Sequence, residues 1–488
     1  MKQKLLAILL RCRSAFHFVK TMPFKIRTNS SLVHAAIIFA TLVLVAVTGF
    51  FVNAQTPETQ TRPSEKLAAR EKARLPDYKG PRRFIGRKAL ITFSPDGRLV
   101  TMSGRRRSIT VWDVETGALK ATLLGGKDSK EGISGFAFSP DGRTAATRDY
   151  LDKSVRLWDV ETWQVKATLP GRKRNLETRI KAGSSFEEEF GPVPFSPDGR
   201  SVLSEREDDV VAVSEVTGCL ERMTLRHETH DTAAKDILKT VFLGGSRHFL
   251  YLQTGYSADG RWIFTINGDK SAKIWDAATG KLHSDISNNE RIYRANFTPD
   301  SSALLTVEQQ GGMKLWEVET GQLRGVVAPK GHFEYLMKGY EFSRDGERIA
   351  TFYLGDTRLW NLKTGASLHK LPNSQTTDAT FSPDGRWLAT ASRDSKSAAS
   401  IWDVETGELK LSFASTGSKS VSVIYSPDGN ILATTNDKGV TLWDAQTGDL
   451  LATLGEARYP VAFSPDGHMV VTGGRNDTAI LWELQGRR

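Results

Sequence analysis

The 488 residues of this chain suffice for one large domain or for two domains of ordinary size. Its only cysteines are Cys12 and Cys219, and Cys12 falls in an amino-terminal targeting segment, so we expect no internal disulfide in the rest of the chain. The net charge of +10 resembles that of a nucleic-acid-binding protein, but seven positive and no negative residues lie within residues 1–54, which leaves +3 for the remainder. Charge therefore does not support nucleic-acid binding, and we expect none.

The chain begins with a basic segment followed by an apolar one. Residues 35–52 contain no charged side chain, and the seven positive charges precede them. This pattern is typical of an export signal or of a membrane-anchoring helix. Small residues at Val52 and Ala54 favour signal cleavage after residue 54, whereas the length of the apolar run also suits a single-pass anchor. Met22 is an alternative start to Met1, and with either start the rest of the chain is predicted to lie outside the cytoplasm.

Residues 55–80 are polar and contain Pro57, Pro63 and Pro76, which indicates a linker. Within this linker, Ser64 to Leu75 is a candidate short helix. Residues 81–488 are predicted to form one domain, because a single repeated pattern runs through them to the carboxyl terminus.

The repeated pattern occurs nine times, with a period of roughly 40 residues. Each copy opens with alternating apolar residues that are closed by a Ser-Pro-Asp-Gly type of turn, as in the run from Phe381 to Arg386. A short strand ending in Thr or Ser follows, then a strand that ends in Trp-Asp, and then a Thr-Gly turn and a fourth strand. Pro, Asp and Gly are the residues that tight turns require. The pattern therefore predicts an all-β chain of stacked, four-stranded antiparallel sheets.

These copies resemble WD40 repeats of the bacterial type. The third-strand positions that carry the resemblance are Trp112, Asp113, Trp158, Asp159, Trp275, Asp276, Trp316, Trp360, Trp402, Asp403, Trp443, Asp444 and Trp482. The resemblance implies a single-ring β-propeller, used in its family mostly as a rigid interaction platform, in which these residues are structural. We expect eight or nine blades, because the copy between Trp158 and Trp275 is degenerate and has Ser214-Glu215 in place of Trp-Asp.

Two details of the family pattern are missing. Its Gly-His pair occurs only as Gly331-His332, so in most blades we expect the family's buried Asp-His-Ser-Trp network to be replaced by a smaller set of bonds from the hydroxyl residues. The last copy ends just after its third strand. We therefore expect the stretch Pro81–Ile85 to supply the missing outer strand and to close the ring.

Catalytic and metal-binding motifs are weak. The nearest match to a G-x-S-x-G elbow, Gly255 to Asp259, ends in Asp and belongs to a repeat turn. The run from His227 to Asp231 contains possible metal ligands, but without HExxH spacing, and we favour a polar surface loop over a metal site. We accordingly predict no catalytic residue, no metal and no cofactor.

Departures from the repeat are the candidate binding features. They are insertions at Gly171–Pro192 and at residues 219–248, which are expected on loops at one edge of the ring, and Trp163 in a turn position that is Gly in six other copies. Because Trp tolerates positive φ poorly, we expect that turn to take another form. The Trp163 side chain then either packs on a neighbouring blade or anchors a partner. The candidate partner-binding residues are Trp163, Arg172, Lys173 and Arg174.

The function that the sequence favours is that of a non-enzymatic, exported or membrane-tethered scaffold that binds other proteins through its loops. An uncleaved amino-terminal segment would add the membrane as a partner. The alternative is an extracytoplasmic enzyme or small-ligand-binding propeller that uses the central channel of the ring.

Overall fold

The computed structural model describes sixteen segments of the chain, and every regular element within them is a β-strand. They are residues 67–76, 91–103, 108–125, 132–150, 152–171, 193–207, 209–228, 252–267, 270–308, 312–328, 337–353, 356–372, 376–392, 397–414, 422–475 and 478–486. The predicted amino-terminal helix and signal, the alternative start at Met22 and most of the linker lie outside these residues. The described segments contain no apolar helix of membrane-spanning length.

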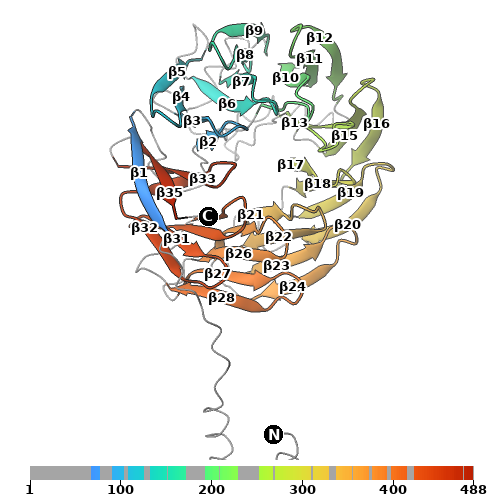
Figure 1. Ribbon diagram of the computed structural model, residues 1–488. Coiled ribbons are helices and arrows are strands. Elements are labelled where there is room, and N and C mark those ends of the chain that lie inside the picture. Colours follow the sequence, from blue (N-terminus) through green and yellow to red (C-terminus); the bar gives the residue numbers. More distant parts are fainter. Residues whose placement is uncertain are drawn as a thin grey trace, which may run out of the picture. The chain divides into compact units, whose positions relative to one another are not determined.

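The described strands form nine antiparallel sheets, arranged as the blades of a propeller around one axis (Figure 1). Nine is the higher of the two predicted blade numbers. Blade 1 contains β2 (Ile91–Phe93), β3 (Leu99–Ser103), β4 (Ile109–Asp113) and β5 (Leu119–Leu123). Blade 2 contains β6 (Ile133–Phe138), β7 (Thr144–Asp149), β8 (Val155–Asp159) and β9 (Val165–Leu169). Blade 3 contains β10 (Ser201–Glu207), β11 (Val210–Glu215) and β12 (Glu221–Arg226).

The next three blades each have four strands. Blade 4 contains β13 (Gln253–Tyr256), β14 (Trp262–Ile266), β15 (Ser271–Asp276) and β16 (Leu282–Ser287). Blade 5 contains β17 (Ile292–Phe297), β18 (Ala303–Glu308), β19 (Met313–Glu317) and β20 (Leu323–Ala328). Blade 6 contains β21 (Met337–Phe342), β22 (Arg348–Tyr353), β23 (Asp356–Asn361) and β24 (Ser367–Leu371).

The last three blades include both ends of the described chain. Blade 7 contains β25 (Thr376–Phe381), β26 (Trp387–Ser392), β27 (Ser397–Asp403) and β28 (Leu409–Ala414). Blade 8 contains β29 (Ser422–Tyr425), β30 (Ile431–Thr435), β31 (Val440–Asp444) and β32 (Leu450–Leu454). Blade 9 contains β33 (Arg458–Phe463), β34 (Met469–Gly473) and β35 (Ala479–Gln485), with β1 (Ala68–Leu75) as its outer strand.

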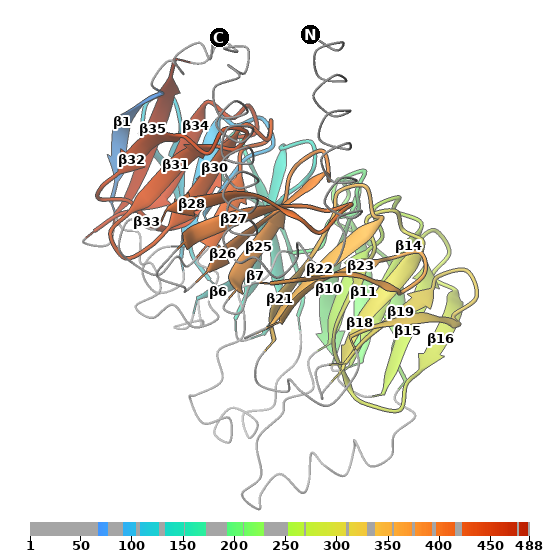
Figure 2. The same ribbon diagram turned by 90° about the horizontal axis from the view of Figure 1, so that it is seen from below.

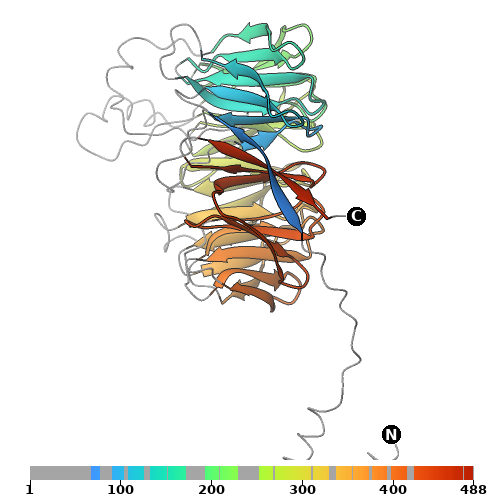
Figure 3. The same cartoon turned by 60° about the vertical axis from the view of Figure 1, so that its left-hand side comes forward.

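Chain order runs from the axis to the rim within each blade, except that β1 is the outermost strand of blade 9; β24 and β28 are outermost in blades 6 and 7 (Figure 1). Figures 2 and 3 show the strands crossing the thickness of the ring. Because neighbouring strands are antiparallel, the first and third turns of every blade lie on one face of the ring, which we call the turn face. The second turns and the connections between blades lie on the opposite face.

The hydrophobic core consists of nine clusters, and each cluster fills the wedge between two consecutive blades. Between blades 1 and 2, for example, fully buried Ile109 and Val111 pack with Phe136 and Ala145. Burying one Ile side chain in this way contributes roughly 1.5–3 kcal/mol. Every sheet is therefore covered on both faces, which explains why strands two and three are almost continuously apolar.

The ring is closed by β1, which pairs with β35 from Ala68↔Gln485 to Leu75↔Ala479. Closure by an amino-terminal strand is confirmed, but the donor is not Pro81–Ile85, which lies outside the described residues. The helix predicted for Ser64 to Leu75 is wrong. Ala, Arg, Glu and Lys favour helices as an isolated sequence, but pairing with β35 and burial of Leu75 outweigh that weak preference.

Candidate interaction site

Tryptophans at the end of the third strands are buried structural residues. In seven blades the indole Nε1 donates to a Thr Oγ1 on the second strand, at 2.8–3.0 Å. The pairs are Trp158–Thr147, Trp275–Thr265, Trp316–Thr306, Trp360–Thr351, Trp402–Thr390, Trp443–Thr434 and Trp482–Thr472. Trp112 Nε1 is buried without a partner, and blade 3 has Ser214 instead of Trp. The smaller hydroxyl-based network that we predicted is thus confirmed in seven blades.

Blade 4 carries a fuller version of this network, built on His227. The imidazole is completely buried, with Nδ1 lying 2.8 Å from Thr265 Oγ1 and Nε2 lying 3.0 Å from Ser271 Oγ. Trp275 donates to the same Thr265 hydroxyl. Both ring nitrogens are occupied by hydroxyls, so His227 is neither a metal ligand nor part of a surface loop, and both interpretations of this residue are wrong.

The sequence search missed this histidine because Arg226, not Gly, precedes it, and because its partner Thr265 lies 38 residues further along the chain. His230 and Asp231 lie outside the described residues, as does His332. Across the described segments, no three His, Cys, Asp or Glu side chains gather in a way that could hold a metal ion.

The aspartates of the Ser-Pro-Asp-Gly turns are used by the turns themselves. In blade 2, Ser139 Oγ donates to Asp141 Oδ1 at 2.5 Å, and the amide of Arg143 donates to the same oxygen at 3.0 Å. The hydrogen bond from Ser139 holds the pKa of Asp141 below its usual range. Ser257 in blade 4 makes the same bond to Asp259, which confirms that the Gly255–Asp259 run is a turn and not a nucleophile elbow.

The Trp-Asp carboxylates have a similar local role. Asp113 Oδ1 accepts bonds from the amide and the hydroxyl of Thr116, at 2.9 and 2.8 Å, and thereby fixes the Thr-Gly turn. The backbone bond from Thr116 lowers the pKa of Asp113. These bonds account for the repeated acids as parts of the fold.

Trp163 keeps the turn geometry of the other blades, contrary to our prediction. Its φ is +55°, in the left-handed region, and its amide donates to Asp159 O at 2.7 Å, as Gly117 does to Asp113. The indole is half-buried and packs against the core cluster between blades 1 and 2, as Leu99 and Ala121 of blade 1 also do. Burial of the ring offsets a backbone cost of about 1 kcal/mol.

Consecutive turns touch one another around the turn face. A Cβ on Gly142 would lie 3.7 Å from Cδ of Pro95 in the preceding blade, so the glycine of one turn rests on the proline of the previous one. Blades 4 to 6 depart from this pattern through Ala258, Ser301 and Arg344, which replace Pro, Gly and Pro. Ser301 has φ of +62° and accepts a hydrogen bond from the amide of Asp259.

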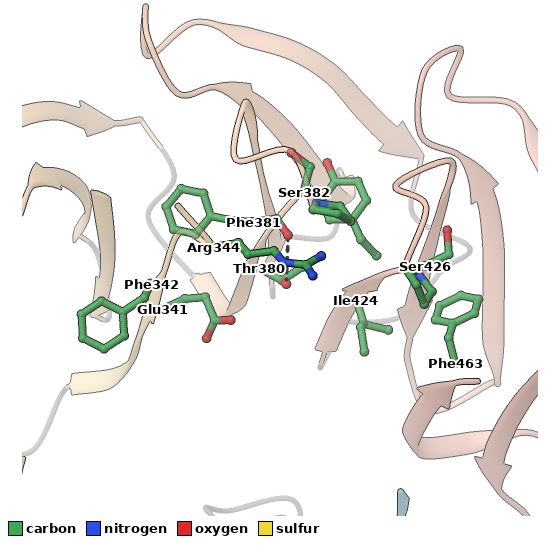
Figure 4. A pocket seen from close by; sticks show the side chains of 12 residues that line it. Glu341, Phe342, Arg344, Thr380, Phe381, Ser382, Ile424, Ser426 and Phe463 are labelled. Atoms are coloured by element: carbon green, nitrogen blue, oxygen red, sulfur yellow. Dashed lines mark hydrogen bonds between the residues drawn. The ribbon is translucent and has the colours of Figure 1, made fainter. Parts of the chain in front are cut away.

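A pocket of about 310 Å³ opens among the turns of blades 6, 7 and 8. Figure 4 shows Arg344, Thr380 and Ile424 around it, with Phe463 of blade 9 on its far side. Its lining is largely aromatic and aliphatic, with a single cation and a single carboxylate, Glu341. This combination suits a ligand that has both an apolar body and a charged group.

Polar side chains on the inner strands mostly join neighbouring blades. The Gln253 amide accepts from the backbone N of Ala295 and donates to its O, at 3.1 and 3.2 Å. Asp378 Oδ2 accepts from Ser422 Oγ at 2.5 Å and from Val423 N at 3.2 Å. These groups therefore serve the cohesion of the ring.

The other departures from the repeat are less informative. Arg172, Lys173 and Arg174 lie outside the described residues, as do nearly all of the Gly171–Pro192 insertion and the second half of the 219–248 insertion. Of the four candidate partner-binding residues, the structure therefore places only Trp163, which lies between blades 1 and 2 and away from the pocket.

Comparison with known proteins agrees with this geometry. The family model described as "WD domain, G-beta repeat" matches residues 117–159, 365–396, 407–444 and 461–483. A WD repeat-containing protein of Deinococcus radiodurans is 29% identical over 221 residues, which cover 41% of this chain and 71% of that protein. The transcriptional corepressor LEUNIG_HOMOLOG of Arabidopsis thaliana is 27% identical over 240 residues, covering 46% of this chain and only 29% of its own.

Solved structures show the same architecture. The C-terminal WD40 domain of Sif2 superposes with a TM-score of 0.53 at 12% identity, over 86% of this chain and 99% of that domain. At this identity the likeness concerns the fold alone.

Proposed function

Because the chain belongs to the WD40-repeat family, we propose that it is a non-enzymatic, exported or membrane-tethered platform that binds other proteins. The observation that carries the proposal is that nearly all of the conspicuous Trp and Asp residues of the repeat are bonded within the fold. What remains at the surface is a rigid ring of turns with a few departures from the repeat. Rigid presentation of loops favours binding, because little entropy is lost on association.

Export rests on the sequence of residues 1–54 alone. A basic segment, an apolar run and the small residues Val52 and Ala54 are the pattern of a signal or an anchor. With either alternative the propeller works outside the cytoplasm. Fractionation of native cells tests this directly: intact protein in the cytosol would refute export.

The interaction role is tested by proximity labelling with a ligase fused to the carboxyl terminus of the full chain in its native cells. A fusion of the ligase to residues 1–66 is the matched control, because it has the same targeting segment without the propeller. We expect a small set of extracytoplasmic proteins to be labelled by the full chain alone. Identical labelling by both fusions would contradict the proposal.

Trp163 provides a variant with a defined structural reference. Trp163→Gly restores the residue that six other blades have at this position. If Trp163 anchors a partner, the variant loses labelled proteins. Unchanged labelling assigns the side chain to blade packing only.

The alternative role, binding of a small ligand or catalysis in the central channel, is tested by metal analysis and by a melting-temperature screen. A stoichiometric metal ion, or a large stabilisation by one small molecule, would favour that role over a pure scaffold.

A further inference from the structure

The pocket on the turn face combines an apolar floor with two residues that depart from the repeat. Phe342, Phe381, Ile424 and Phe463 supply apolar surface from four consecutive blades. The two departures are Arg344 and Tyr425, and both line the pocket. The repeat does not account for these two side chains, and both of them line the same pocket.

Arg344 occupies a position that is Pro in seven of the nine turns. The turn itself is unchanged, because the amide of Gly346 donates to Ser343 O at 3.0 Å and the amide of Ser343 donates to Arg348 O at 2.9 Å. The Arg344 side chain is exposed and extends across the pocket (Figure 4). Among the described residues its guanidinium has no hydrogen-bond or ion-pair partner, so the fold makes no use of this cation.

Tyr425 occupies a position that is Phe in seven other blades. Those residues are Phe93, Phe138, Phe195, Phe297, Phe342, Phe381 and Phe463. The Tyr425 side chain is 7% exposed, and its hydroxyl is buried without a hydrogen-bond partner. Burial raises the pKa of Tyr425, so the hydroxyl stays protonated and remains a donor. An unpaired buried hydroxyl is costly, and Tyr256 in blade 4, away from the pocket, has one as well.

Charge restricts the ligand further. Arg is the preferred partner of carboxylates, because its planar guanidinium can donate two parallel hydrogen bonds. Glu341, the single acidic lining residue, comes from blade 6, and its carboxylate lies apart from the guanidinium of Arg344 (Figure 4). A bound carboxylate is therefore favoured on the side of the pocket that faces blades 7 and 8.

We propose that this pocket binds an acidic segment of a partner protein, with one apolar side chain on the aromatic floor and a neighbouring carboxylate on Arg344. This assignment rests on the proposed role as an interaction platform, and it names the place and the chemistry of one contact.

The test uses the full chain and three sets of fluorescent decapeptides. Each peptide has one central Phe or Leu, flanked by Glu in the first set, by Gln in the second and by Lys in the third. Fluorescence anisotropy gives the dissociation constants. We expect the Glu set to bind at least tenfold more tightly than the Gln set, and the Lys set to bind more weakly than both.

Two substitutions restore the residues of the repeat and should leave the fold intact. Arg344→Pro is expected to weaken binding of the Glu set about tenfold or more, whereas Tyr425→Phe removes only a buried hydroxyl and should change binding by less than about twofold. Blade 4 provides matched controls, because Ala258 stands at the Pro position and Tyr256 at the Phe position, away from the pocket. Ala258→Pro and Tyr256→Phe should leave the affinity unchanged within about twofold.

Equal binding of the Glu and Gln sets, or full binding by Arg344→Pro, would overturn the assignment. Equal losses in the blade 4 controls would do so as well. Proximity labelling separates this outcome from failure of the proposed function. If the partners are still labelled while the peptides fail to bind, the pocket assignment falls and the platform role stands.

Discussion

Blades 3 and 4 are neighbours that use the repeat to different extents. Blade 4 has four strands and a continuous network in which His227 and Trp275 both bond to Thr265. In the described part of blade 3 there are three strands and, at the inner position, a single bridge, Phe195↔Val202. Its Ser204 hydroxyl, at the position of Thr265, is buried without a partner because Ser214 replaces the tryptophan.

Blade 3 nevertheless keeps its place in the ring. Val202 and Val211 are completely buried against the neighbouring blades, as the corresponding residues of blade 4 are. The comparison shows that apolar burial between blades is sufficient to hold a sheet in the propeller. The polar network adds stability to that packing and is not required for it.

The largest effect is expected when the network of blade 4 is broken at its centre. His227→Ala leaves a cavity and removes the hydrogen bonds from the imidazole to Thr265 and Ser271, which should lower the free energy of unfolding by about 3 kcal/mol. Urea titration measures the loss. His468→Ala is the control, because His468 is exposed on blade 9 and its removal should change stability by less than about 0.5 kcal/mol.

Removing the hydroxyl of the second strand should change stability differently in the two blades. Thr265→Val removes the acceptor of Trp275 and the partner of His227 at nearly constant volume, and should cost about 2 kcal/mol. Ser204→Ala in blade 3 removes a hydroxyl that has no partner, so it should be neutral or slightly stabilising. Similar losses from the two variants would contradict the distinction between the blades.

A smaller contrast concerns the turn that follows the third strand. Gly280 in blade 4 has φ of +71°, and an added Cβ would lie 2.6 Å from Met223 Sδ. Gly280→Ala should therefore cost about 1–2 kcal/mol. Cys219 already holds this position in blade 3 with φ of +54°, so Cys219→Gly relieves strain, loses little packing and should be close to neutral by urea titration.

The smallest effect is expected in acid. Hydrogen bonds from the hydroxyl and the amide of Thr279 lower the pKa of Asp276, so this carboxylate stabilises the fold above its unfolded-state pKa of about 3.9. That contribution is lost as the pH falls through the lower, folded-state pKa. Asp276→Asn should therefore weaken the dependence of the melting temperature on pH between about pH 4 and pH 2. Glu215→Gln, at the same position in blade 3, is the control, and a change of equal size there would count against this role.

Repetition made the fold predictable, and non-repeated residues account for what the sequence did not reveal. The turns and the Trp-Asp endings predicted a propeller of eight or nine blades, because most copies carry the residues that their tight turns require. The closing strand was missed because Ala68–Leu75 has no repeat motif and a composition that favours helices. His227 was missed because its partners lie at the far side of an insertion.

The candidate pocket also could not be predicted from the sequence alone. Arg344 and Tyr425 are recognisable in the sequence as departures from the repeat, but they lie 81 residues apart. Stacking of the consecutive blades 6, 7 and 8 places their turns around one pocket. Trp163 was misjudged for a related reason, because the cluster that buries its ring combines residues from two copies of the repeat.

The pairing of β1 with β35 has a consequence for biosynthesis. Of the strands in the ring, β1 is synthesised first and β35 last. The edge of β1 therefore has no pairing strand until β35 has been made. Charged residues such as Arg70 and Lys72 stand along the waiting strand and discourage pairing with other chains. A chain that is released early has no β35 and leaves the ring open. Pairing of β1 with β35 therefore occurs only in chains that have been synthesised at least as far as β35.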